Sequence, residues 1–282
     1  MASFVCAHVV RNKGSTRSVG NLVAALKKSC LYSGGSWLGD LEQLKLREVL
    51  RELKLEDLSN SRRKRPIRVK ELLAIINSLR LEEPIELLVA TMLAVGHDGL
   101  LRSAELLSGF KVRHLTWSLD KSSIRLEIER SKMNRSGESE YVTLFDYGKF
   151  SAVALMRRWF DKNQLWNKYD RIIFPAVRYN KLYVEETPSY YWWRKTIKWC
   201  CTRIGLDAKH YSGHSLRAGG ATDLFVARVP YYVIKKMGRW KSDAAMLYYR
   251  CDEDVERAVT EAFTRLFEIE SSIKIKNGGS SV

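Results

Sequence analysis

One short segment carries residue types that bind phosphate and move protons on it. The segment 211–221 is Tyr-Ser-Gly-His-Ser-Leu-Arg-Ala-Gly-Gly-Ala, and its pattern predicts the start of a helix. His214 and Arg217 are three residues apart and therefore lie on one face of the first turn. The free N–H groups of that turn favour an anion, and arginine adds a two-pronged grip on phosphate oxygens. Glycine is unfavourable in the interior of a helix because it costs conformational entropy. Two of them, Gly219 and Gly220, therefore predict that another backbone packs closely against this helix.

The charge of the whole chain also favours a polyanionic partner. The 282 residues include 48 Lys and Arg against 32 Asp and Glu, a formal net charge of +16. Residues 251–282 hold 4 basic and 7 acidic residues, so the positive excess lies in residues 1–250. A basic chain with 11% aromatic residues suits nucleic acid and fits poorly with an enzyme of small neutral metabolites.

The sequence carries none of the common signatures of nucleotide-binding or metal-dependent enzymes. It has no P-loop, GxGxxG, HExxH or GxSxG motif, and its histidines lack metal-ligand spacing. We therefore expect chemistry without a metal or cofactor. The five cysteines form no CxxC pair, which fits free thiols in a reducing compartment. The longest apolar run, Leu87–Gly96, is about half of the ~20 residues that a membrane span needs, so no membrane association is expected.

Further motifs flank the His–Arg pair in a fixed order along the chain. Arg102 follows an apolar helical segment, and Lys132 lies at the turn of a predicted basic hairpin. Downstream, a Gly-Arg-Trp pattern ending at Trp240 precedes Tyr249. This order resembles the tyrosine recombinases, also called the phage integrase family. The sequence around the His–Arg pair and the Gly-Arg-Trp pattern most resemble those of recombinases from eukaryotic mobile elements, the DIRS-like retroelements and Cryptons.

The resemblance implies a DNA strand transferase and a role for each matched position. It implies six catalytic residues: Arg102, Lys132, His214, Arg217, Trp240 and Tyr249. Tyr249 stands nine residues after Trp240, where the family has its nucleophile. Tyr248 is its rival, because neighbours on a helix diverge by about 100° and only one can face the phosphate. Most members of the family have histidine at the position of Trp240, and Cre recombinase is similar to this chain in having tryptophan there. Glu105 matches a family carboxylate that orients the site.

The chemistry of phosphodiester transfer supports these assignments independently. A tyrosine hydroxyl can attack the phosphate and conserve the bond energy in a 3′-phosphotyrosine. Arg102 and Arg217 stay ionised and can neutralise the developing charge. Lys132 can protonate the leaving 5′-oxygen, and His214 can act as general acid or base near neutral pH.

The spacing of apolar residues predicts a mainly α fold with a small antiparallel β-sheet (α+β). Two helices, at 19–31 and 37–55, predict a helical domain at 1–60, which by position resembles the family's core-binding (DNA-binding) domain. A basic linker at 61–68, a catalytic domain at 69–270 and a flexible tail at 271–282 follow. The linker contributes five candidate DNA-binding residues: Arg62, Arg63, Lys64, Arg65 and Arg68.

Within the predicted catalytic domain, helical and strand patterns alternate. Helices are predicted at 69–79, 84–95, 150–161, 188–199, 214–227, from 230 onward and at 252–268. Strands are predicted at 112–117, 124–128 and 141–144, with a turn at 134–137. Helical spacing favours a core position for both Trp192 and Trp199.

Together these features predict a site-specific recombinase that cuts and rejoins double-stranded DNA through a 3′-phosphotyrosyl intermediate, for integration or excision of a mobile element. The resemblance implies a homotetramer on DNA, linked by exchange of the acidic helix 252–268 between subunits. It implies the nucleus in a eukaryote, and otherwise the cytoplasm or nucleoid. Two alternatives stay open: a type IB topoisomerase-like relaxing enzyme, and a catalytically silent, domesticated DNA-binding protein.

Overall fold

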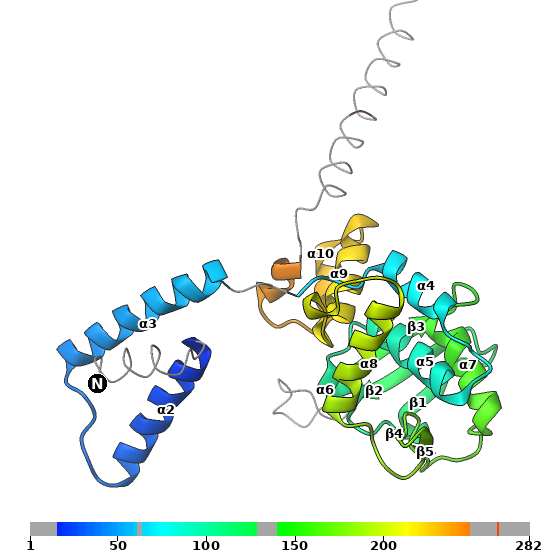
Figure 1. Ribbon diagram of the computed structural model, residues 1–282, viewed down its shortest axis with the longest axis horizontal. Coiled ribbons are helices and arrows are strands. Elements are labelled where there is room, and N and C mark those ends of the chain that lie inside the picture. Colours follow the sequence, from blue (N-terminus) through cyan, green and yellow to red (C-terminus); the bar gives the residue numbers. More distant parts are fainter. Residues whose placement is uncertain (1–15, 61–63, 129–139, 249–263, 265–282) are drawn as a thin grey trace, which may run out of the picture. The chain divides into compact units, whose positions relative to one another are not determined.

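The computed structural model describes residues 16–60, 64–128, 140–248 and residue 264 (Figure 1). Lys132, Tyr249, Arg62, Arg63 and the predicted helix 252–268, Thr264 excepted, lie outside these residues. The chain divides into two compact units, residues 1–63 and 64–282, and each is described by itself. Helices dominate the described residues and the sheets are small and antiparallel, which confirms the predicted fold class.

The first unit contains two helices joined by a short loop. These are α2 (Thr16–Tyr32) and α3 (Asp40–Asn60), close to the two helices predicted from apolar spacing. Val23 and Leu46 are buried between them, and Trp37 packs against this pair. Gly34 has a left-handed φ of 75°, so a glycine suits the turn after α2.

The second unit is built around a single buried helix. Its α-helices are α4 (Val69–Ser78), α5 (Pro84–Asp98), α6 (Ser103–Leu106), α7 (Ala152–Asn163), α8 (Tyr190–Arg203), α9 (His214–Val226) and α10 (Tyr231–Met237). Short 3₁₀ turns lie at η1 (Val112–His114), η2 (Ala208–His210) and η3 (Asp243–Tyr248). Every residue of α5 from Glu86 to His97 is buried, and α7 and α9 pack against it. The apolar run of the sequence is therefore the core helix of this unit.

A three-stranded antiparallel sheet accompanies the helices. Its strands are β1 (Leu115–Trp117), β2 (Ser123–Ile128) and β3 (Glu140–Phe145), in the order β1-β2-β3. Ile124, Leu126 and Ile128 are buried, as the alternation of β2 predicts. The predicted strand 112–117 is only half correct, because residues 112–114 form η1. A second hairpin, β4 (Ala176–Arg178) with β5 (Lys181–Tyr183), was not predicted.

The two glycines of α9 allow other backbones to approach that helix closely. A Cβ atom on Gly219 would overlap the carbonyl oxygen of Ile67, and one on Gly220 would crowd the carbonyl oxygen of His97. The prediction of close packing at both glycines is confirmed. The chain segment before α4 and the end of α5 are thereby fixed against the helix that carries Arg217.

Residues 64–68, assigned to the linker from sequence, are packed in the second unit. The Arg65 amide donates to the His210 carbonyl (2.7 Å), and the Ile67 amide donates to the Ser215 carbonyl (2.8 Å). Ile67 is fully buried. The part of the predicted linker that the structure describes is therefore an extended segment of the folded unit.

The tryptophans of α8 differ from their predicted environment. Trp193 is fully buried, but Trp199 is 44% exposed, so its predicted core position is wrong. Trp192 is partly buried and lines, with Trp199, a surface pocket of about 640 Å³ between α8, β5 and the start of α5. None of the described helices is long and apolar enough to cross a membrane. Cys30, Cys200 and Cys201 are free thiols.

Candidate active site

Arg102 lies where the chain leaves the core helix and turns into α6. Leu100 has a left-handed φ of 47°, which makes this turn sharp. The Arg102 side chain is 25% exposed and donates from Nη1 to Oε1 of Glu105 (2.5 Å). Its backbone amide donates to the other oxygen of the same carboxylate (2.8 Å). Glu105, only 2% exposed, therefore fixes both the start of α6 and the direction of the Arg102 guanidinium.

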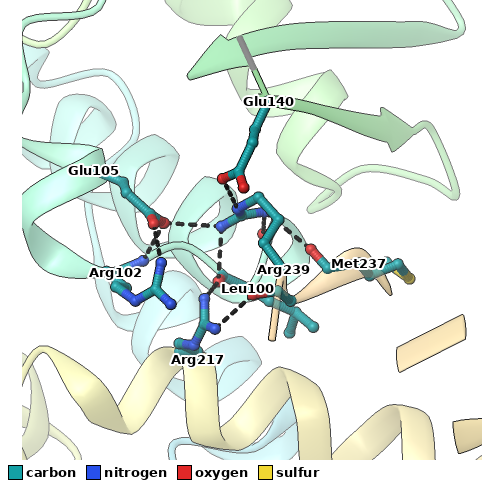
Figure 2. Close-up of polar contacts among 9 residues, drawn as sticks. Leu100, Arg102, Glu105, Glu140, Arg217, Met237 and Arg239 are labelled. Atoms are coloured by element: carbon teal, nitrogen blue, oxygen red, sulfur yellow. Dashed lines mark hydrogen bonds and ion pairs between the residues drawn. The ribbon is translucent and has the colours of Figure 1, made fainter. Parts of the chain in front are cut away.

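Arg217 is held from the opposite side by α9. Its side chain is buried, and it donates from Nη1 to the Leu100 carbonyl (2.5 Å), which lies 117 positions earlier in the sequence. Nη2 donates to the Gly238 carbonyl (2.5 Å), and the guanidinium carbon lies 4.1 Å from the centre of the Trp240 ring. The structure therefore brings Arg102 and Arg217 to the turn after α5 (Figure 2). Trp240, a third predicted site residue, joins them through its contact with Arg217.

Glu105 is ionised at this site despite its burial. Burial alone would raise the pKa of its carboxyl, but the charge of Arg239 and the hydrogen bonds and charge of Arg102 outweigh burial and lower it. Two arginines therefore share one carboxylate, which leaves positive charge in excess. An excess of arginine charge at a partly exposed position suits an anionic group such as a phosphodiester.

His214 begins α9 and is exposed, one turn before Arg217. A Cβ atom on the preceding Gly213 would overlap Oγ of Ser103, so the first turn of α9 lies directly against the start of α6. This contact brings the His214 end of α9 to the helix that follows Arg102. His214 therefore lies at the end of α9 that adjoins α6, and its role in proton transfer stays a prediction.

One residue of this site was missed by the sequence reasoning. Arg239 precedes Trp240, and its Nη2 donates to Glu105 (2.8 Å) and to the Leu100 carbonyl (3.3 Å). Figure 2 shows its guanidinium between those of Arg102 and Arg217 and the carboxylate of Glu140. The Gly-Arg-Trp motif was used as a family resemblance, and no role was assigned to its arginine. The position of Arg239 between a glycine and Trp240 was the available signal that it belongs to the site.

A model of the phage integrase family matches residues 65–255. The chain belongs to this family. The match spans the described residues of the second unit after Lys64, Thr264 excepted. The family assignment made from the order of motifs is thereby confirmed, whereas the DIRS-like and Crypton subgroup stays a prediction.

Solved structures of site-specific recombinases share the fold of this phage integrase family member. XerH recombinase, in a post-cleavage complex with a palindromic difH substrate, is 17% identical with a TM-score of 0.53, over 70% of this chain and 53% of that chain. This chain therefore spans about half of that XerH chain. XerA recombinase is 12% identical with a TM-score of 0.53, over 94% of this chain and 96% of that chain. No curated protein matches the chain significantly.

A transposon integrase is similar as well. The Tn1549 transposon integrase, solved with circular intermediate DNA, is 12% identical with a TM-score of 0.56, over 92% of this chain and 83% of that chain. Similarity at this level of identity shows a shared fold. The predicted class, a helical domain plus a tyrosine recombinase catalytic domain, agrees with it.

Four predicted site residues of this family member have no described position. Lys132 and Tyr249, with Arg62 and Arg63, lie outside the described residues. The chain leading to Tyr249 is described as far as η3, whose Ala245 is buried in one cluster with Leu100 and Trp240. Their roles stay predictions.

The described basic residues of the predicted linker differ in their environment. Lys64 and Arg65 are exposed, and Lys64 donates to the Lys209 carbonyl (2.6 Å). Arg68 instead directs Nε to Asp223 (2.9 Å). Lys64 and Arg65 thus present charge at the surface, whereas the charge of Arg68 is used within the fold. Among the described residues, no group of three or more His, Cys, Asp or Glu side chains could hold a metal ion.

Proposed function

We propose that this chain is a site-specific DNA recombinase that cuts and rejoins double-stranded DNA through a 3′-phosphotyrosyl intermediate. The observation that carries the proposal is the convergence of Arg102 and Arg217 on the turn after α5, with His214 exposed at the start of the helix that carries Arg217. Family membership supports it, because the matched region contains all six predicted catalytic positions. XerH and the Tn1549 integrase were solved with DNA, which supports a DNA substrate here.

In the proposed reaction, the two arginines bind the non-bridging oxygens of the scissile phosphate. The Tyr249 hydroxyl attacks phosphorus, forming the phosphotyrosyl bond and breaking the bond to the 5′-oxygen. His214 takes the phenolic proton, and Lys132 gives a proton to the leaving oxygen. Reversal of these steps with a different 5′-hydroxyl joins a new pair of strands. The arginines supply the charge neutralisation, so the proposal requires no metal or cofactor.

Trp240 has a supporting part in this scheme. Its ring lies against the Arg217 guanidinium, and the side chain is almost completely buried. A buried arginine stacked on an aromatic ring has fewer rotamers available, so its N–H groups stay directed at the phosphate. Trp240 cannot transfer a proton at this position, which leaves acid–base work to His214 and Lys132.

The decisive experiment uses the two neighbouring tyrosines as a matched pair. The protein is incubated with a library of nicked duplexes of random sequence, and covalently attached DNA is recovered and sequenced. Tyr249→Phe should abolish the adduct and retain DNA binding, whereas Tyr248→Phe should retain both. Adduct formation by Tyr249→Phe but not by Tyr248→Phe would assign the nucleophile to Tyr248.

The same experiment separates the two alternatives. A silent DNA-binding protein would give no adduct with any sequence in the library. A type IB topoisomerase-like enzyme would relax supercoiled plasmid as a monomer and without paired target sites. A recombinase should instead give adducts on a restricted set of sequences and join strands between two duplexes.

The assembly is proposed on the same footing. The resemblance supports a tetramer on DNA in which the acidic segment 252–268 passes to a neighbouring subunit, and mobilisation of an element of the DIRS-like or Crypton kind. Removal of the residues after Asp252 should then reduce cooperative assembly on paired target sites more than binding to a single site. Undiminished cooperativity in that truncated protein would refute the exchange.

A further inference from the structure

Arg239 occupies a backbone position that is unfavourable for an arginine. Its φ is 56°, in the left-handed region that glycine adopts most readily. Its side chain is nevertheless only 5% exposed and lies among charged groups of the candidate active site. A long cationic side chain is rarely buried, and here it is buried in a strained conformation. The position therefore points to a use for this side chain that outweighs the strain.

The contacts of Arg239 reach the acceptors of both predicted catalytic arginines. Nη2 donates to Glu105 Oε2 (2.8 Å), and the other oxygen of that carboxylate accepts from Arg102. Nη2 also donates to the Leu100 carbonyl (3.3 Å), which accepts from Arg217. Nη1 donates to the Met237 carbonyl (2.9 Å) in the turn before Trp240. One guanidinium thus joins three separate chain segments at the site (Figure 2).

A further contact links Arg239 to β3, the strand that follows residues 129–139 in the sequence. Its Nε lies 3.8 Å from Oε2 of Glu140, the first residue of β3. Neither atom has a hydrogen-bond partner among the described residues, although both are buried. A shift of less than 1 Å would turn this ion pair into a hydrogen bond. Arg239 therefore interacts with the first residue of β3. In the sequence, this residue directly follows the segment 129–139, which contains Lys132.

We propose that Arg239 is a positioning residue of the strand-transfer site, which sets the geometry of Arg102 and Arg217 through Glu105 and the Leu100 carbonyl. This inference rests on the proposed recombinase function. The charge of Arg239 is directed to two carboxylates, Glu105 and Glu140. Arg217 instead donates to the carbonyl oxygens of Leu100 and Gly238. Removal of Arg239 frees the Glu105 carboxylate to turn toward Arg102 and Arg217. The two arginines then lose the alignment that phosphate binding in the transition state requires.

The test compares Arg239→Gly with Arg239→Lys in single-turnover adduct formation at saturating DNA. Glycine suits the left-handed backbone, so Arg239→Gly removes the side chain without adding strain. We expect this variant to form the adduct about 100-fold more slowly with unchanged DNA affinity. Arg239→Lys keeps the charge but lacks the planar fork, so it should resemble Arg239→Gly. Arg178→Ala, which removes an exposed arginine paired with Glu186, serves as the matched control and should react like the original protein.

Two further measurements separate positioning from general support of the fold. Glu105→Gln combined with Arg239→Gly should be no slower than the slower single variant, because both changes disturb the same unit. Added guanidinium should restore part of the rate to Arg239→Gly, as a merely structural loss would not allow.

Each unfavourable result has its own meaning. A normal rate in Arg239→Gly, a loss of DNA affinity equal to the loss of rate, or additive effects in the double variant would overturn the positioning role while the recombinase function stands. Absence of adduct in the unsubstituted protein would refute the recombinase function instead.

Discussion

Two clusters of buried charge border the end of α5, and they differ in charge balance. The arginine cluster consists of Arg102, Glu105, Glu140, Arg217 and Arg239. The histidine cluster consists of Arg68, His97, Asp98 and Asp223. In the first, three cations face two carboxylates. In the second, two carboxylates face Arg68 and a protonated His97.

The histidine cluster is satisfied by its own members. His97 lies between the two aspartates, 3.0 Å from Asp98 and 3.1 Å from Asp223. Asp223 also accepts from Arg68 (2.9 Å) and from the Val69 amide (2.6 Å). This cluster joins α5, α9 and the start of α4, and its charges cancel. We therefore expect this cluster to stabilise the fold.

The arginine cluster has a cation in excess and is partly open to solvent through Arg102. Buried charge without compensation is costly, and such cost is retained where a ligand supplies the missing charge. The comparison teaches that burial and ion pairing alone do not identify a functional site. The sign of the residual charge is more informative, and the excess positive charge of the arginine cluster favours an anionic ligand.

The largest expected effect is a loss of chemistry on substitution in the arginine cluster. Arg217→Lys keeps a positive charge but cannot bond the carbonyls of Leu100 and Gly238 and a phosphate together. Adduct formation in single turnover should fall by about 1,000-fold. The free energy of unfolding, measured with urea, should change far less than the rate. A rate close to that of the original protein would remove Arg217 from the proposed site.

A substitution in the histidine cluster should show the opposite pattern. His97→Gln leaves Asp98 and Asp223 buried with only the charge of Arg68 against them, because the ring between them is lost. Breaking a buried ion pair costs about 3 to 5 kcal/mol, and the urea unfolding midpoint should fall accordingly. Adduct formation by the protein that remains folded should be normal. A selective loss of rate would show that the two clusters act as one.

The sequence predicted the arginine cluster better than the histidine cluster. Arg102 and Arg217 were predicted because phosphate chemistry restricts residue type and because the family orders them along the chain. His97 and Asp223 are 126 positions apart, and nothing in their local spacing pairs them. Long-range contacts of this kind depend on how α5 and α9 pack, which only the folded chain shows. Arg239 had a local signal in its place between Gly238 and Trp240, but its partners Glu105 and Leu100 lie 134 and 139 positions away.

The fold was predictable where one physical rule dominated. The buried helix α5 followed from its apolar run, and the pairing of β2 with β3 followed from alternation. The hairpin β4–β5 has only three residues in each strand, and its turn places Tyr179 and Asn180 at left-handed φ without a glycine to signal it. The predicted core position of Trp199 was wrong because helical spacing shows which residues share a face of α8, but not what packs against that face. This face borders a pocket.

A smaller effect should follow from pH, through the histidine cluster. Burial lowers the pKa of His97, but the hydrogen bonds and charges of Asp223 and Asp98 outweigh it and raise the pKa from 6.5 to about 9. The folded state therefore binds a proton that the unfolded state releases between these values. The contribution of protonated His97 to the free energy of unfolding is fully present below pH 6.5. It declines by about 3 kcal/mol as pH rises toward 9. Urea unfolding across this range measures it, and His97→Gln should lose this decline; an equal decline in both proteins would contradict the assignment.

The smallest effect should come from an ion pair of the same chemistry at the surface. Arg178 pairs with Glu186, and the two side chains are 55% and 45% exposed. Solvent and salt screen such a pair, so Arg178→Ala should change the free energy of unfolding by less than about 1 kcal/mol and leave adduct formation unaltered. These predictions assign three consequences to a guanidinium–carboxylate contact in one protein: chemistry where cations are in excess and buried, stability where charges balance and are buried, and little of either at the surface. A large effect of Arg178→Ala would show that burial does not separate these cases.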